Sequence, residues 1–213
     1  MPRLTGLAPD PRQAGYRLVD VDRGRFASLP ADALAPLELE VGTEIPGPLL
    51  ARLQELADVE AAFRAASRLL AARGRARADL RRRLIQKQHP PPAVEAALAR
   101  LEDGGLLDDG RFAVEYAARR ATRGRGPVRI VADLVTQGVE HGVAEAAVRA
   151  AFAQEGLDPA HTLRTVAARR AVQLASLAPA VRRRRLFAYL ARRGYGGAEL
   201  RRVVDDVTEA GAT

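Results

Sequence analysis

The sequence has no cysteine and no tryptophan, and only 4% of its 213 residues are aromatic. Without cysteine the chain can form neither a disulfide nor a thiolate metal site. No apolar run approaches the ~20 residues that a membrane-spanning helix needs. Met1 leads into no apolar segment of the kind that signal peptides contain, so we expect a cytoplasmic protein that binds no membrane.

Motifs for catalysis are also missing. The chain has no G-x-x-x-x-G-K-[ST] phosphate loop and no G-x-S-x-G nucleophile turn. His89, His141 and His161 lack the spacing of metal ligands and are expected to be loop or cap residues. We therefore expect no enzymatic activity, no catalytic residue, no metal and no cofactor.

Lysine is nearly absent, since Lys87 is the single lysine among 34 cationic side chains. Residues 1–60 contain six arginines and ten acids, a net charge of −4, whereas the rest of the chain has a net charge of +12. Arginine suits both carboxylate and phosphate. The excess of positive charge after residue 60 predicts an acidic protein or a nucleic acid as partner. The alternative is that these side chains only keep the protein surface solvated.

Patterning divides the chain into five parts. We predict a flexible tail over residues 1–13, then a small acidic β-containing segment with a linker helix over 14–58. Strands are expected over 17–22, from Phe26 onward and over 37–41, with a turn at 22–25. Three-helix repeats are expected over 59–106, 107–156 and 157–213.

The repeats rest on one register of apolar residues, with internal spacings of 4, 10, 4 and 3. Its three copies are Leu80, Leu84, Val94, Leu98 and Leu101; Ile130, Leu134, Ala144, Val148 and Ala151; and Leu186, Leu190, Leu200, Val204 and Val207. Each repeat also has an upstream helix, with Phe63 and Leu70, with Phe112 and Tyr116, or with Leu163, Val166 and Val172. These patterns predict a mainly α fold in which three tandem three-helix repeats form an elongated, curved array.

The stretch from Leu107 to Gly138 reads as two helices joined by a Gly/Arg connector. Phe112 and Tyr116 share one helix face as structural aromatic anchors, and arginines follow them. Such an arginine either packs on Tyr116 as a structural cation–π contact or reaches a partner, and the residues alone favour neither. The candidates for partner or DNA binding are Arg81, Arg82, Arg111, Arg119, Arg120, Arg123, Arg125, Arg129, Arg184, Arg192 and Arg193.

The chain resembles the RecX family, the regulators of the bacterial RecA recombinase, over nearly its whole length, and three segments carry the resemblance. The most specific is the element from Leu106 or Leu107 to Ala113, followed by Tyr116 and then by the Arg-Gly…Arg-Ile…Leu element from Arg123 to Leu134. Residues 75–80 resemble the family's Arg-Ser-x-x-Glu-Leu pattern, with Ala76 in place of serine and Asp79 in place of glutamate. The third repeat resembles the family only in its apolar register and basic character.

This resemblance implies a helical modulator that binds RecA and lies in the groove of the RecA–single-stranded DNA filament. There it would inhibit the recombinase's ATPase, strand exchange and filament growth. It would bind single- and double-stranded DNA weakly, without sequence specificity, and we expect a monomer.

Two other classes stay open. One is a stand-alone helix–turn–helix DNA-binding regulator, and the other is a helical scaffold for another protein. Residues 94–103 and 144–155, the candidate recognition helices, are poor in base-reading side chains, which disfavours the first.

Overall fold

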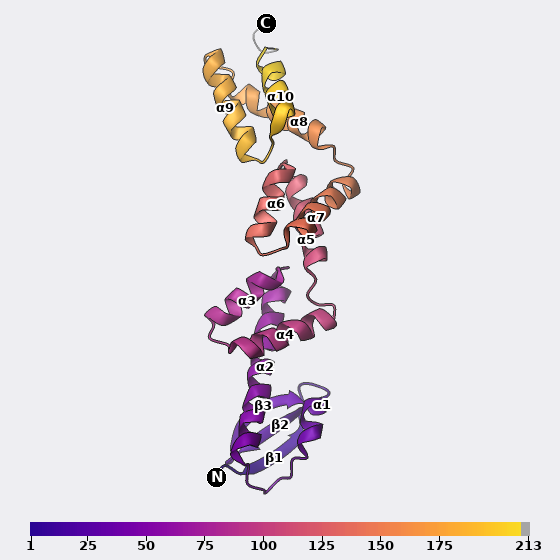
Figure 1. The fold of residues 1–213 in the computed structure, drawn as a ribbon, viewed down its shortest axis with the longest axis vertical. Helices are drawn as coiled ribbons and strands as arrows, with labels where there is room; N and C mark the ends of the chain where they lie inside the picture. Colours follow the sequence, from indigo (N-terminus) through magenta and orange to yellow (C-terminus); the bar gives the residue numbers. More distant parts are fainter. Residues whose placement is uncertain (210–213) are drawn as a thin grey trace. The chain divides into compact units, whose positions relative to one another are not determined.

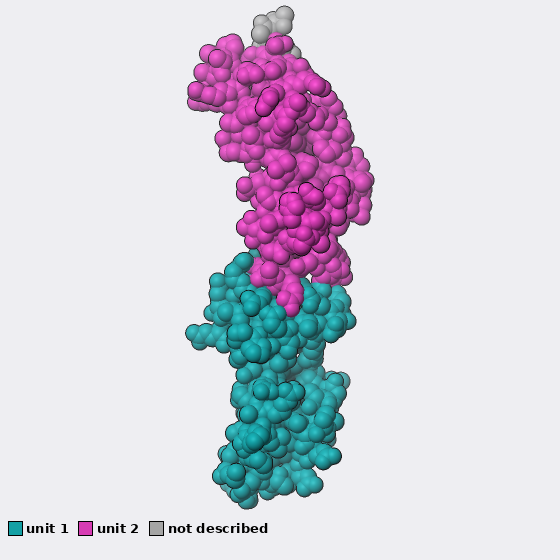
Figure 2. All heavy atoms as spheres, viewed as in Figure 1, with its two compact units in different colours: residues 1–74, 80–107 teal, residues 75–79, 108–213 magenta. Residues whose placement is uncertain are grey.

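A computed structural model describes residues 1–209. The chain forms two compact units (Figure 2). The first contains residues 1–74 and 80–107; the second contains residues 75–79 and the chain from residue 108 onward. Figure 1 labels the elements along the chain.

The first unit begins with an antiparallel sheet of β1 (Leu4–Pro9), β2 (Tyr16–Val21) and β3 (Gly24–Pro30), in that spatial order. β2 and β3 confirm two of the predicted strands. Asp22 and Arg23 both have positive φ, as a two-residue hairpin turn requires. Short helices follow, α1 (Ala31–Leu34) and η1 (Ala35–Leu37).

Two predictions for this segment are wrong. Residues 1–13 are not a flexible tail, because β1 pairs along β2 and Leu4 is 1% exposed. Pairing with a strand farther along the chain orders this segment, and no local pattern reveals that partner. Residues 37–41 are not a strand, since Pro36 lies within η1 and Glu38 has a left-handed backbone, which interrupts an extended chain.

Helix α2 (Gly47–Ala72) runs without a break from the sheet into the first repeat. The boundary predicted between residues 58 and 59 therefore falls inside one helix and is wrong as a break in the structure. The predicted linker helix and the first helix of the repeat are the same element. Leu53 of this helix is buried with the sheet, and Ala65 and Ala66 are buried with the repeat.

A polar network joins sheet and repeat within this unit. The carboxylate of Glu60, 3% exposed, accepts bonds from Arg64 Nε at 2.7 Å and Arg100 Nη1 at 3.0 Å. Arg100 also donates to the Tyr16 hydroxyl at 2.7 Å and lies 4.0 Å from the ring centroid of Phe63. Burial lowers the pKa of Arg100, but the bonds to Tyr16 and Glu60 outweigh it and raise that pKa. The buried carboxylate is thus fully paired, as burial of a charge demands.

The remaining helices form the three repeats. They are α3 (Arg77–Gln86) and α4 (Pro91–Asp103), which pack with α2; α5 (Asp109–Ala121), α6 (Pro127–Thr136) and α7 (His141–Gln154); and α8 (Pro159–Gln173), α9 (Pro179–Arg192) and α10 (Gly197–Glu209). Proline at the first turn of α6 and α8 suits a helix start.

The predicted register is confirmed. Its members are buried in all three repeats, apart from the half-buried Val207. The residue that follows the middle helix is left-handed in each copy: Gln88, Gly138 and Gly194 have φ of 64°, 92° and 89°. One predicted apolar position is wrong, because Val172 is 77% exposed. It lies in the last turn of α8, beyond the buried Leu163 and Ala167.

Candidate functional site

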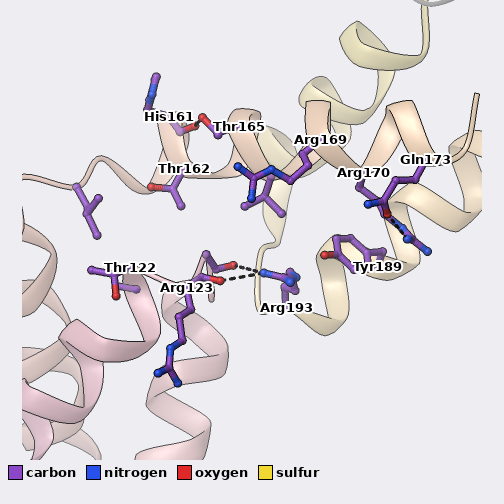
Figure 3. Close-up of a pocket in the computed structure, with 14 residues that line it drawn as sticks. Thr122, Arg123, His161, Thr162, Thr165, Arg169, Arg170, Gln173, Tyr189 and Arg193 are labelled. Atoms are coloured by element: carbon purple, nitrogen blue, oxygen red, sulfur yellow. Dashed lines mark hydrogen bonds between the residues drawn. The ribbon is translucent and has the colours of Figure 1, made fainter.

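The connector between α5 and α6, residues 122–126, lies against the C-terminal end of α9 inside the second unit. Gly126 N–H donates to Arg193 O at 2.7 Å, and Arg193 Nη1 donates to the carbonyls of Arg123 and Gly124, both at 3.1 Å (Figure 3). The Tyr195 hydroxyl donates to Gly124 O at 3.3 Å. Burial raises the pKa of Tyr195 to about 12, so it stays a protonated donor at neutral pH.

Glycine is required at this junction. A Cβ on Gly126 would lie 2.3 Å from the carbonyl oxygen of Gly194, which is closer than any side chain can pack. Gly124 has a φ of 70°, in the left-handed region that favours glycine. The glycines of the sequence motif therefore allow the second and third repeats to meet backbone to backbone.

The helix before the connector carries the aromatic anchors. The rings of Phe112 and Tyr116 lie 5.9 Å apart, and the guanidinium of Arg120 lies 5.0 Å from the centroid of Tyr116. Arg119 is exposed and lies 3.7 Å from Glu115. The structural cation–π contact thus belongs to Arg120, whereas the Arg119 side chain is exposed to solvent.

A pocket of about 410 Å³ opens beside the connector, between the second and third repeats (Figure 3). Arg123 comes from the connector, Arg169 and Arg170 from α8, and Arg193 from the end of α9. Tyr189 lies between two of them, with the guanidiniums of Arg170 and Arg193 each 4.9 Å from its ring centroid. No lining residue in the described part of the chain is acidic.

Sequence reasoning found only part of this group. Arg123 and Arg193 were candidates, and the structure brings them together. Arg169 and Arg170 were missed, although the adjacent pair on a helix whose buried face holds Leu163 was a usable signal. The sequence does not reveal that α8 packs beside a connector that lies about 45 residues earlier in the chain.

The other candidates are placed elsewhere. Arg81 pairs with Glu95, and with Arg82 it belongs to the first unit. Arg129 pairs with Asp133 at 2.9 Å. Of the rest in the second unit, Arg111, Arg184 and Arg192 are exposed and Arg125 is half-buried.

The middle repeat also exposes an apolar stripe that the sequence reading missed. Val128, Val131 and Val135 recur at i, i+3 and i+7 on α6, and Val128 is 68% exposed. They line a groove of about 630 Å³ between α6 and α7. At the matching place in the first repeat, Arg81 and Glu95 form an ion pair instead.

These features define a class: a helical-repeat protein preceded by a small sheet, with a basic pocket and an apolar groove in its second unit. No helix within residues 1–209 is long and apolar enough to span a membrane. Models of the first, second and third three-helix domains of RecX match residues 62–101, 108–148 and 160–204.

Regulatory protein RecX of Thermobifida fusca (strain YX) is 35% identical over 147 residues, which are 67% of this chain and 76% of that protein. The chain therefore belongs to the RecX family. The protein of the same name from Halorhodospira halophila (strain DSM 244 / SL1) is 45% identical over 84 residues, 39% of this chain and 52% of that relative. The chain thus spans about half the length of some curated relatives that it matches.

A solved structure described as the crystal structure of regulatory protein RecX has the same fold. Its TM-score is 0.74, at 18% identity, over 98% of this chain and 100% of that one. The crystal structure of RecX from Lactobacillus salivarius gives a TM-score of 0.60 over 70% of this chain and 96% of that one, also at 18% identity.

Proposed function

We propose that this protein is a negative regulator of the RecA recombinase that acts in the cytoplasm. It binds RecA and lies in the groove of the RecA–DNA filament, where it inhibits the ATPase, strand exchange and filament growth. The observation that carries the proposal is the match of all three repeats to RecX domains.

Two surfaces of the second unit support this function. The exposed valines of α6 provide apolar contact area for a protein, because a contiguous apolar stripe on a surface helix favours association. The basic connector and its pocket provide charge for an acidic surface or for phosphate. A filament of protein on DNA offers both kinds of partner.

The direct test is single-strand-dependent ATP hydrolysis by the host's RecA, with this protein at substoichiometric amounts. We expect strong inhibition by the wild-type chain. Changing Arg119, Arg123 and Arg129 to Ala should weaken inhibition at least several-fold, since Arg123 lies in the connector and the other two lie on the helices that it joins.

The matched control removes the same charge from exposed arginines elsewhere in the second unit: Arg185, Arg201 and Arg202 changed to Ala. It should inhibit like the wild type. Absence of inhibition by the wild-type chain at any ratio would refute the proposed function, and equal losses in both triple variants would refute the assigned surface.

A further inference from the structure

An ion pair bridges the last two helices of the first repeat, and another bridges those of the third. In the first repeat Arg81 of α3 pairs with Glu95 of α4. In the third repeat Arg183 of α9 pairs with Asp205 of α10 at 2.7 Å. In both repeats, charged side chains therefore cover the seam between the two helices.

The second repeat has apolar residues at the positions of these two arginines. When the three repeats are aligned on their shared apolar register, Val131 of α6 occupies the position of Arg81. Pro127 occupies the position of Arg183. Within residues 1–209 no ion pair joins α6 to α7, because the charged pairs of each helix lie along that helix. The seam of the second repeat is therefore open.

The charged side chains of α7 beside this seam are paired only weakly. Glu145 lies 3.3 Å from His141 and 3.9 Å from Arg149, one turn away on either side, and all three side chains are exposed. Exposed pairs of this kind contribute at most about 1 kcal/mol. The row therefore offers alternating charges that a bound partner could meet at little cost.

The open seam is the groove of about 630 Å³ between α6 and α7. Val128 and Val135, 68% and 40% exposed, lie on its α6 side with the partly buried Val131 between them. Seven residues of α6 span about 10.5 Å, or two helical turns. An extended segment on these side chains would leave its own N–H and C=O groups without partners, whereas a helix pairs them internally.

We propose that this groove docks an amphipathic helix of a partner protein, with apolar side chains at i, i+3 or i+4, and i+7 against the valines. One flank of that helix carries an acidic residue that meets Arg149 and, one turn away, a basic residue that meets Glu145. The inference rests on the proposed function, which makes a RecA subunit the partner. It deepens that function by assigning a surface and a mode of contact.

The first test is binding of the full chain to the host's RecA by biolayer interferometry, without DNA. Val128→Arg and Val131→Arg each place a charge on the apolar side of the groove, and the second also copies the first repeat by putting arginine near Glu145. We expect each change to raise Kd at least about tenfold, because a docked helix would bury the new charge against apolar side chains.

Val172→Arg is the matched control, since it makes the same change at a valine that is 77% exposed on α8 and does not line the groove. It should bind like the wild type. Thermal melts check that each variant folds, and Val128→Arg keeps the test decisive if Val131→Arg unfolds. Wild-type affinity in Val128→Arg, or an equal loss in Val172→Arg, would overturn the groove as the docking site.

A second pair of variants tests the acidic flank of the docked helix. Arg149→Gln should raise Kd and reduce its dependence on salt, because it removes the charge that meets the acid. Arg202→Gln, at an exposed position on α10, should change neither quantity. Equal effects of the two variants would overturn the charge pairing, since net charge alone would then explain them.

Photo-cross-linking tests whether the occupant is helical. The chain has no cysteine, so Val128→Cys or Val135→Cys attaches a benzophenone at one defined place. A distance of about 10.5 Å corresponds to about seven residues of a helix but to about three residues of an extended segment. Cross-links from the two places that lie about seven residues apart in one segment of RecA support the helix, and a separation of about three would overturn it.

The same variants distinguish failure of this inference from failure of the proposed function. Equal ATPase inhibition by the wild type and by Val128→Arg would overturn the groove and leave the proposed function standing. A wild-type chain that neither binds nor inhibits RecA would refute the proposed function and with it the partner named here. A wild-type dimer in sedimentation velocity that Val128→Arg dissociates would assign the groove to a second copy and overturn the partner helix.

Discussion

At the scale of single residues, the adjacent Arg119 and Arg120 of α5 make different contacts. The Arg120 guanidinium lies 5.0 Å from the ring centroid of Tyr116, whereas Arg119 forms a long, exposed pair with Glu115. We expect Arg120→Ala to lower the free energy of unfolding by about 0.5–1 kcal/mol through loss of the cation–π contact. Arg119→Ala should change it by less than about 0.5 kcal/mol. Urea unfolding of both variants measures these changes. Equal losses of unfolding free energy in the two variants would contradict the prediction.

Glu140 makes the stability of the second repeat depend on pH. Its carboxylate accepts bonds from the N–H groups of Gly142 and Val143 at the start of α7, which holds the pKa of Glu140 below its ordinary value of 4.5. Because the folded-state pKa is the lower one, the cap stabilises at pH above the ordinary value and is lost as pH falls through the lowered pKa.

Glu140→Ala should therefore lower Tm at pH 7, and the difference in Tm from the wild type should narrow as the pH falls from 7 through the lowered pKa of Glu140. Thermal melts across this range measure the gap. Asp206→Ala, which removes an exposed carboxylate from α10, is the control and should show a smaller gap at neutral pH. A gap for Glu140→Ala that does not depend on pH would count against the charged cap.

At the scale of elements, the decisive contact is between the connector and the C-terminal end of α9. Gly126 has a φ of −75°, which alanine tolerates, so Gly126→Ala tests the close approach to Gly194 alone. We expect a loss of about 1–3 kcal/mol from overpacking. Gly196→Ala is the matched control, since a Cβ there meets nothing within 4 Å. Denaturant unfolding measures both variants. Equal losses of unfolding free energy in Gly126→Ala and Gly196→Ala would contradict the steric explanation.

At the scale of the whole molecule, most buried apolar residues within 1–209 belong to four clusters, one with the sheet and one in each repeat. Stability in such a chain is a sum of local terms and neighbour terms. Leu84→Ala should cost about 2–5 kcal/mol in the first repeat and speed amide exchange in α3 and α4. Exchange in α9 and α10 should be unaffected, whereas Leu190→Ala should show the reverse. Uniform acceleration in both variants would indicate one cooperative core.

Local chemistry determined most of the secondary structure. The apolar spacing of 4, 10, 4 and 3 identified the buried face of every repeat, because helix periodicity depends on residues that are close together in the sequence. Asp108 caps α5, because its carboxylate accepts from Arg111 N–H at 2.9 Å. Gly138 and Gly194 follow the middle helices of the second and third repeats in a left-handed conformation, and Pro127 occupies the first turn of α6.

Only the tertiary structure decided which distant residues meet. β1 is ordered by pairing with β2, and Arg100 reaches Tyr16 across 84 residues of chain. Arg169 and Arg170 join Arg123 and Arg193 because α8 and α9 pack beside the connector. Such contacts depend on how whole elements pack, and a periodic pattern records only which face is buried. The sequence therefore determined the repeats and their basic character, whereas packing decided which arginines form a pocket and which support the fold.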